Sequence, residues 1–384
     1  MIQTISEITY RDRILQVQDK LKKVHSNGIV ISNFYNIYYM TGLFHFPTER
    51  PLMLYIPVSG EPFVFVPIME IEEANHTFLE DIRTYFEFPG KKHPVKQFTD
   101  EIRKSYPLVS KLSFDGGSYE FISQVKEYLS PIDFEYLSII HDLRLCKDKE
   151  EIELLKKAAI YSDYIVHAGF NLAKPGTTEL ELLQKSTEQT LEKMILDLHR
   201  VVYVPGGPAG GLVPSGSRTA MPHALPSKRE IEYGDTMLLS CGANVEGYRV
   251  ECERTCFVGE ISKEKEKVLN VMAVAQQLAI DNMKPGIKCS EVDAVALDYI
   301  RKEGYGEYLL HRTGHGKGLE EHEAPWIDEG DDSILQPGMV LSSEPGIYIE
   351  GFSGFRHSDT IVVTNEGPLV LTKFPKNIER LIIN

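Results

Sequence analysis

The sequence lacks several features that would assign it to particular classes of protein. Its 384 residues include five cysteines, and none of them forms a Cys-x-x-Cys pair. This usage argues against an oxidising compartment. No stretch approaches the ~20 consecutive apolar residues of a membrane-spanning helix, and the N-terminus MIQTISEITYRDR has no apolar signal-peptide core. We therefore expect a cytoplasmic protein with no membrane partner.

Positive charge is also scarce. Lysine and arginine number 41 against 56 aspartates and glutamates, which gives a formal net charge of -15. This balance argues against binding to nucleic acid or to anionic membranes. The content of 42% hydrophobic and 25% charged residues is typical of a soluble globular enzyme. We expect its partner to be a small molecule.

The second half of the sequence instead concentrates histidines, carboxylates, glycines and prolines in a few segments. Each segment alone is a weak signal, because a glycine-rich turn or a strand entering a bend has a similar composition. The segments are SGSRTAMPHALP (215–226), GDTMLLSCGANVEGYRVECERT (234–255), HRTGHGKGLEEHEAP (311–325), PGMVLSSEPGIY (337–348) and GFRHSDTIVVTNEG (354–367).

In this order and spacing, the five segments resemble the creatinase, prolidase and aminopeptidase P family, whose fold is often called pita-bread. Five segments in register across about 150 residues make coincidence improbable. The resemblance implies an α/β fold in which an N-terminal α/β domain precedes a C-terminal pita-bread domain with internal pseudo-two-fold symmetry. We place the two domains at residues 1–146 and 147–384.

The periodicity of apolar residues predicts the elements within these domains. In the first domain we expect a helix at 11–24 and strands at the runs IVISN, PLMLYIP and PFVFVP. In the second, Thr178 and Glu181 predict a capping box at the start of a helix. Lys-Pro-Gly turns 110 residues apart each separate two helices, as two related halves would require. Beside these turns we expect helices at 147–172, 263–283 and 290–303.

In the metal-using members of this family, two Asp eleven residues apart, one His and two Glu hold two divalent ions. The eleven-residue spacing persists here, but it joins Ser240 to Glu251, and the late Glu falls at Ser358. His315 and Glu344 match. Because serine hydroxyls are poor ligands compared with carboxylates, we expect no dinuclear centre and no cofactor. The alternative is a single divalent metal (Mn, Co or Zn) held by Glu251, His315 and Glu344.

At the site, the sequence most closely resembles the creatinase branch, which works without a metal, and ectoine hydrolases are similar. The Glu-Arg-Thr triplet of that branch is matched at 253–255, and its catalytic His, thirty residues before the Glu, is matched by His223. The resemblance therefore implies that His223, Glu253 and Glu344 are catalytic. The residues expected to bind the substrate are His315, His322, Glu251 and Arg356.

Three carboxylates, those of Glu251, Glu253 and Glu344, would converge in one cleft on this fold. Charges so close need a cation to remain ionised. The cation could be a metal, a nearby arginine or the substrate, and a planar guanidinium or amidinium substrate suits paired carboxylates. The arginines near these motifs are Arg249, Arg254, Arg312 and Arg356.

We therefore predict a hydrolase that cleaves a C–N bond of a small, cationic substrate by metal-independent His/Glu catalysis. The bond could belong to an amide, a cyclic amidine or a guanidine. One alternative is an Xaa-Pro dipeptidase or aminopeptidase with a residual metal site, and another is a catalytically inactive binding module. The resemblance also implies a homodimer, in which the 42–51 loop of the partner subunit, with Phe46, Glu49 and Arg50, would help close the site.

Overall fold

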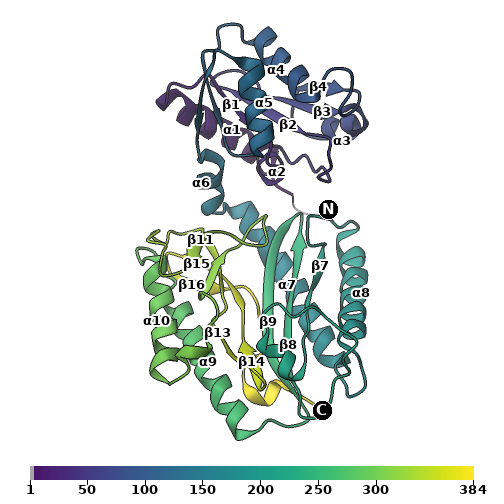
Figure 1. The fold of residues 1–384 in the computed structure, drawn as a ribbon, viewed down its shortest axis with the longest axis vertical. Helices are drawn as coiled ribbons and strands as arrows, with labels where there is room; N and C mark the ends of the chain where they lie inside the picture. Colours follow the sequence, from purple (N-terminus) through teal and green to yellow (C-terminus); the bar gives the residue numbers. More distant parts are fainter. Residues whose placement is uncertain (1–3) are drawn as a thin grey trace. The chain divides into compact units, whose positions relative to one another are not determined.

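The computed structural model describes residues 4–384 and divides them into two compact units (Figure 1). Residues 5–144 form the N-terminal unit, and residues 145–384 form the main body of the C-terminal unit. Each unit has its own sheets and its own buried core. Within residues 4–384, no helix has both the length and the apolar character needed to cross a membrane.

The N-terminal unit is built on six strands. They are β1 (Gly28–Ile31), β2 (Met53–Pro57), β3 (Phe63–Pro67), β4 (Asp81–Tyr85), β5 (Lys111–Phe114) and β6 (Asp133–Tyr136). Their order in the sheet is β4-β3-β2-β1-β5-β6. The three apolar runs predicted as strands are confirmed as β1, β2 and β3, and all their residues are buried, which explains the absence of polar alternation.

Six helices accompany this sheet. They are α1 (Glu7–Lys23), α2 (Phe34–Thr41), α3 (Ile71–Asn75), α4 (Pro94–Ser105), α5 (Tyr119–Leu129) and α6 (Ile139–Leu145). Helix α1 begins four residues earlier than predicted, because the side chain of Ser6 caps it by accepting a hydrogen bond from the Thr9 amide. After α2, residues 43–52 form a segment without helix or strand, in which Phe46 is exposed and Arg50 pairs with Glu87.

The same order of elements occurs twice in the C-terminal unit. In each set, two helices are followed by antiparallel strands. The first set is α7 (Lys149–Leu172), α8 (Glu179–Leu198), β7 (Ala209–Leu212), β8 (Thr236–Val245) and β9 (Tyr248–Val258). The second set begins with α9 (Lys263–Asn282) and α10 (Cys289–Lys302). Its strands are β10 (Gly314–Gly316), β11 (Glu323–Ile327), β12 (Val340–Ser343), β13 (Gly346–Ile349), β14 (Ser353–Arg356), β15 (Asp359–Thr364) and β16 (Gly367–Val370), and β17 (Ile382–Ile383) pairs back onto β9.

The predicted helices of this unit are confirmed, with ends within two residues of those expected. Asp148 caps α7, so this helix starts at Lys149 rather than at residue 147. The predicted capping box of Thr178 and Glu181 is present at α8. Gly176 and Gly286, which end the two Lys-Pro-Gly turns, have φ angles of 86° and 89°, in the left-handed region that favours glycine.

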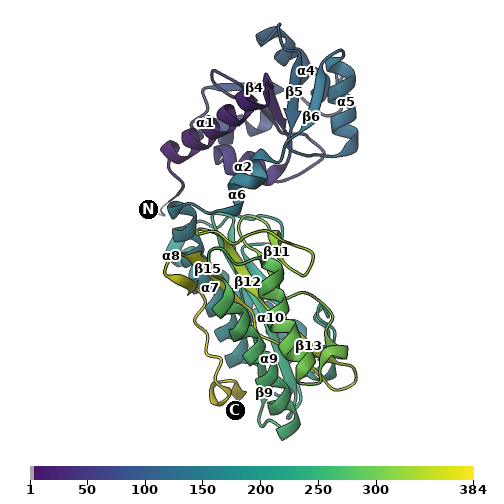
Figure 2. The ribbon, with the colours of Figure 1, turned by 90° about the vertical axis from the view of Figure 1, so that its left-hand side faces the viewer.

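Two sheets of this unit meet where the sequence places its candidate site. One sheet has the order β17-β9-β8-β7 and the other β11-β10-β12-β15-β16. Helix α7 packs along β8 and β9, while α9 and α10 lie side by side, with α9 against β12, β13 and β14 (Figure 2). Between the sheets, Glu253 and Ser358 exchange two backbone hydrogen bonds of 3.0 and 3.1 Å. This bridge holds β9 beside the chain that enters β15.

Candidate active site

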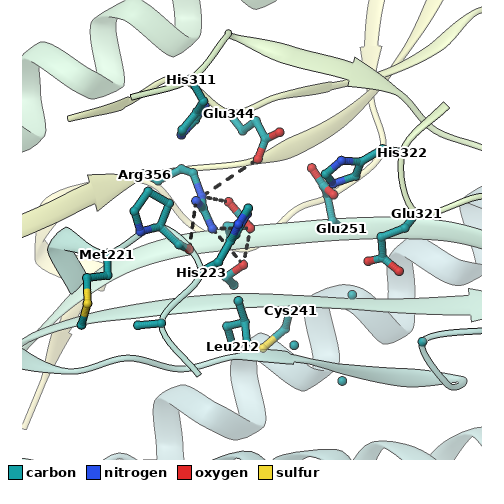
Figure 3. A pocket seen from close by; sticks show the side chains of 18 of the residues that line it. Leu212, Met221, His223, Cys241, Glu251, His311, Glu321, His322, Glu344 and Arg356 are labelled. Atoms are coloured by element: carbon teal, nitrogen blue, oxygen red, sulfur yellow. Dashed lines mark hydrogen bonds and ion pairs between the residues drawn. The ribbon is translucent and has the colours of Figure 1, made fainter. Parts of the chain in front are cut away.

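A cleft of about 890 Å³ lies in the C-terminal unit, and its lining includes most of the predicted site residues (Figure 3). His315 lies against this lining, since its ring stacks on that of His322 and its Nε2 atom is 3.1 Å from a carboxylate oxygen of Glu344. The predicted residues that line the cleft directly are His223, Glu251, Glu253, His322, Glu344 and Arg356. The fold thus brings together all seven.

The β8–β9 ladder positions two of the three carboxylates. Glu253 lies opposite Ser240, and Glu251 lies opposite Gly242. Since side chains alternate between the two faces of a strand, residues 251 and 253 project toward the same side. Opposite Glu251, a side chain at position 242 would clash, because its Cβ would stand 2.7 Å from the Val250 carbonyl oxygen. Only glycine at position 242 allows this close approach of β8 and β9.

Glu253 forms a buried ion pair with Arg356. Arg356 donates through Nε to Oε2 and through Nη2 to Oε1 of this carboxylate, the latter at 3.0 Å. The hydroxyl of Ser240 also donates to Oε1. Burial raises the pKa of Glu253, with Glu344 and Glu251 acting in the same direction and Arg356 opposing them. Of the arginines that the sequence analysis names as possible cations, Arg356 is thus the one that pairs with Glu253.

Glu251 is held by Lys317, a residue that the sequence analysis missed. The ammonium group of Lys317 donates to Oε2 of Glu251 at 2.7 Å and to the carbonyl oxygen of Glu321 at 2.8 Å, and the lysine side chain is fully buried. The hydroxyl of Ser358 donates to Oε1 at 2.8 Å. Although burial favours the neutral acid, Lys317 lowers the pKa of Glu251. Both oxygens of this carboxylate thus accept hydrogen bonds.

Glu344 faces His315. The Nδ1 atom of His315 is 2.9 Å from the Gly316 carbonyl oxygen, so this nitrogen carries the hydrogen and Nε2 faces Glu344. Burial opposes protonation of His315, but Glu251 and Glu344 outweigh it and raise the pKa of the ring. For His322, stacked at 3.8 Å between ring centroids, burial and the charge of His315 lower the pKa to about 4. Of these two histidines, His315 is therefore the one whose protonated form is favoured by its surroundings.

Two further histidines line the cleft. The hydroxyl of Tyr348 already accepts from Arg356 at 2.9 Å, so it donates its own hydrogen to Nε2 of His311, 2.7 Å away. Burial lowers the pKa of His311, and its ring is therefore neutral and committed to Tyr348. His223 is exposed and makes no hydrogen bond or ion pair with any residue of the described chain. Figure 3 shows His223 extending into the cleft.

Other residues near the motifs have structural partners. Arg254 is buried and pairs with Asp359 at 2.7 Å, outside the cleft lining. Arg249 lines the cleft and pairs with Glu321 at 3.3 Å. His357 is fully buried outside the cleft lining, and its Nδ1 atom accepts from the amide of Thr255.

The donor set does not fit two metal ions. Ser240 and Ser358 supply hydroxyls that donate to neighbouring carboxylates, rather than the carboxylate oxygens that would bridge or chelate two ions. One ligand atom each from Glu251, His315 and Glu344 lies within 4.8 Å of the others, which is the spacing a single ion requires. A divalent ion there would, however, share Glu251 with the buried ammonium of Lys317, and like charges repel strongly at such distances.

The fold and the cleft together define the class of the protein, a pita-bread hydrolase. The family model described as "Metallopeptidase family M24" matches residues 153–365, and that described as "Creatinase/Prolidase N-terminal domain" matches residues 13–146. The chain belongs to metallopeptidase family M24. The predicted family and fold class are confirmed, and the protein is an enzyme, a hydrolase that acts on C–N bonds.

Relatives cover nearly the whole chain. An uncharacterized peptidase of Staphylococcus aureus is 32% identical over 369 residues, which are 95% of this chain and 99% of that protein. The Xaa-Pro dipeptidase from Bacillus anthracis is 30% identical with a TM-score of 0.85 and covers 97% of this chain and 99% of its own. The prolidase from Pyrococcus horikoshii is 28% identical, also with a TM-score of 0.85, and covers 96% and 99%.

Proposed function

We propose that the protein hydrolyses a C–N bond of a small substrate without a metal ion. The observation that supports this proposal is the ammonium of Lys317, which is fully buried and donates to Glu251. It supplies a positive charge beside a carboxylate that, in metal-using relatives, would need a divalent ion. Arg356 neutralises Glu253, and His315 faces Glu344, so each of the three clustered carboxylates has a cationic partner from the chain.

Proton transfer is assigned to His223. His311 is committed to Tyr348 and His322 stacks on His315, which leaves His223 as the cleft histidine that is exposed and without a partner among the described residues. In the proposed reaction, His223 accepts a proton from water while the water oxygen bonds to the carbon of the scissile group. Return of that proton to the departing nitrogen breaks the C–N bond and restores neutral His223.

A second candidate is an Xaa-Pro dipeptidase with one divalent ion. Two observations favour it, namely the similarity to an Xaa-Pro dipeptidase and a prolidase and the spacing of Glu251, His315 and Glu344. Those three residues would hold the ion, which when bound would lower the pKa of an attacking water toward neutrality. Xaa-Pro dipeptides are therefore the first substrates to test under either mechanism.

The test is activity after removal of metal. Protein dialysed against a chelator is assayed with Xaa-Pro dipeptides, with guanidine substrates such as creatine and with cyclic amidines such as ectoine, and its metal content is measured. We expect less than one equivalent of transition metal per chain and unchanged turnover. Loss of activity that Mn, Co or Zn restores would overturn the metal-free mechanism and support the second candidate.

We also propose a homodimer in which the 42–51 segment of the partner subunit borders the cleft. Light scattering at assay concentration should give twice the mass of the chain. A monomeric, fully active protein would contradict this arrangement.

A further inference from the structure

Arginines on the cleft lining differ in their carboxylate partners. Arg249 pairs with Glu321, and Arg356 pairs with Glu253. Arg312 also lines the cleft, yet no carboxylate of the described residues 4–384 lies within ion-pair distance of it. A half-buried guanidinium in a cleft is costly to leave without an anion, because it has lost part of its hydration.

The position of the Arg312 guanidinium is fixed by two contacts. Its Nε atom donates to the Gly314 carbonyl oxygen at 3.0 Å, and its Cζ atom lies 4.6 Å from the ring centroid of Trp326. Trp326 is directly opposite His315 in the β10–β11 ladder, so the two side chains leave the sheet on the same face. The guanidinium therefore lies on the His315 face, with both terminal nitrogens free to donate to a ligand.

The charge of Arg312 is not balanced within the cleft. Among the other charged lining residues, Glu251 is paired with Lys317, Glu253 with Arg356 and Glu344 with His315. This changes the substrate expected from the sequence, because the carboxylates that were to hold a cationic substrate already have cations of the chain. Arg312 is thus the charged group on the cleft lining for which the described residues supply no ion-pair partner, although the net charge of the whole chain is -15.

We propose that Arg312 binds a carboxylate group of the substrate. Two parallel N–H donors match the two oxygens of a carboxylate, which makes this pairing both strong and directional. The substrate class is thus a small amide that carries a free carboxylate, and this statement rests on the proposed function for the scissile bond. Leu212, Met221 and Leu310 also line the cleft and suit an apolar substituent on such a molecule.

The test uses a pair of probes that differ in one charge, N-acetyl-L-proline and N-acetyl-L-prolinamide. Calorimetric titration of the chelator-treated full chain should show tighter binding of the acid by about 10-fold or more, the usual range for a hydrogen-bonded charge. Arg312→Met keeps the aliphatic stem over Trp326 and should abolish this preference. Arg312→Lys, which keeps the charge without the planar fork, should retain part of it. Chromatography of each probe after titration checks for turnover.

Arg301→Met is the matched control, because Arg301 is exposed on α10 and pairs with Asp298. It removes the same charge from the protein and should leave the preference unchanged. Equal binding of acid and amide by the native protein, including failure of both to bind, would overturn the proposal, as would an Arg312→Met variant that still prefers the acid. This experiment measures binding in the absence of metal. If turnover proved to depend on a metal, the proposed metal-free mechanism would be wrong, but the role of Arg312 in binding would still hold.

Discussion

Lys317 and Glu251 form a buried ion pair, and the ammonium group lowers the pKa of the Glu251 carboxyl against the effect of burial. Transfer of an ammonium or a carboxylate out of water costs several kcal/mol, and close pairing offsets that cost. The lysine side chain is 0% exposed and that of Glu251 12%, so water does not reach the ammonium and reaches the carboxylate only from the cleft. Lys317 thus supplies a positive charge beside Glu251 from within the chain.

Substitution of Lys317 should therefore reduce stability sharply. Lys317→Met leaves the carboxylate of Glu251 with the Ser358 hydroxyl as its hydrogen-bond donor and with His315 at 3.9 Å, and we expect the free energy of unfolding to fall by about 3–5 kcal/mol. Adding Glu251→Gln removes the stranded charge and should recover part of the loss. Lys156→Met is the control, because its pair with Glu153 is exposed. Urea unfolding followed by fluorescence measures these changes, and a loss below about 1 kcal/mol for Lys317→Met would contradict a buried charge pair.

His223→Ala tests the assigned proton carrier. Loss of a general acid or base reduces turnover by ~10²-fold or more, and because His223 has no partner in the described chain, stability and KM should change little. His76→Ala, an exposed histidine of the N-terminal unit, should retain full activity. The assay uses whichever substrate of the panel the native enzyme cleaves. Near-normal turnover by His223→Ala would remove this residue from the mechanism.

At the scale of elements, strand alternation explains what the sequence could and could not predict. Glu251 and Glu253 are two residues apart on β9, so their common face followed from the period of a strand. Lys317 lies two residues after His315 in the GHGKG segment, and this position beside a candidate site residue was the signal that could have identified it. The pair of Arg356 with Glu253 could not be predicted in this way, because it joins β14 to β9 across 103 residues and depends on how the two-stranded β13–β14 sheet lies against β9.

This arrangement of strands predicts how a metal site could be restored. The triple change Ser240→Asp, Glu251→Asp and Ser358→Glu supplies the missing carboxylates, but Lys317 would still place its charge beside them. We expect calorimetry to detect weak Mn binding by the triple variant and binding at least ~10-fold tighter once Lys317→Leu is added, because a unit charge about 4 Å away costs more than 1 kcal/mol even in a polar medium. Equal affinities of the two variants would show that Lys317 does not govern the site.

At the scale of the whole molecule, two units with separate cores share one chain. The segments that identified the family lie in the C-terminal unit, which also holds the cleft and the single tryptophan, Trp326. The partly exposed strands β4, β5 and β6 were not predicted, whereas β1, β2 and β3 of the N-terminal unit were predictable because they are continuous apolar runs and wholly buried. Its polar interior was not, since Asn36, Asp115 and Arg144 form a network across 108 residues of sequence.

Asp115 gives the N-terminal unit a pH dependence of its own. Burial raises the pKa of this carboxyl to about 7, against hydrogen bonding by Asn36 and the charge of Arg144. In the unfolded chain the value is about 3.9. Between these two values the folded state therefore binds one proton more than the unfolded chain. The contribution of Asp115 to stability is fully present below about pH 4 and is lost as the pH rises to about 7.

Asp115→Asn should remove this loss while retaining an acceptor for the amide of Asn36, which donates at 2.6 Å to Oδ2 of Asp115. We expect the variant to be more stable than the native protein at pH 8, by up to about 4 kcal/mol for a shift of three pKa units, and nearly equal to it at pH 4.

Circular dichroism reports both units, whereas fluorescence of Trp326 reports the C-terminal unit. If the units unfold independently, only the circular dichroism transition should move, and a shift of both would show cooperative unfolding. A variant that is less stable at pH 8, or that gains equally at pH 4, would show that Asp115 is ionised in the folded protein.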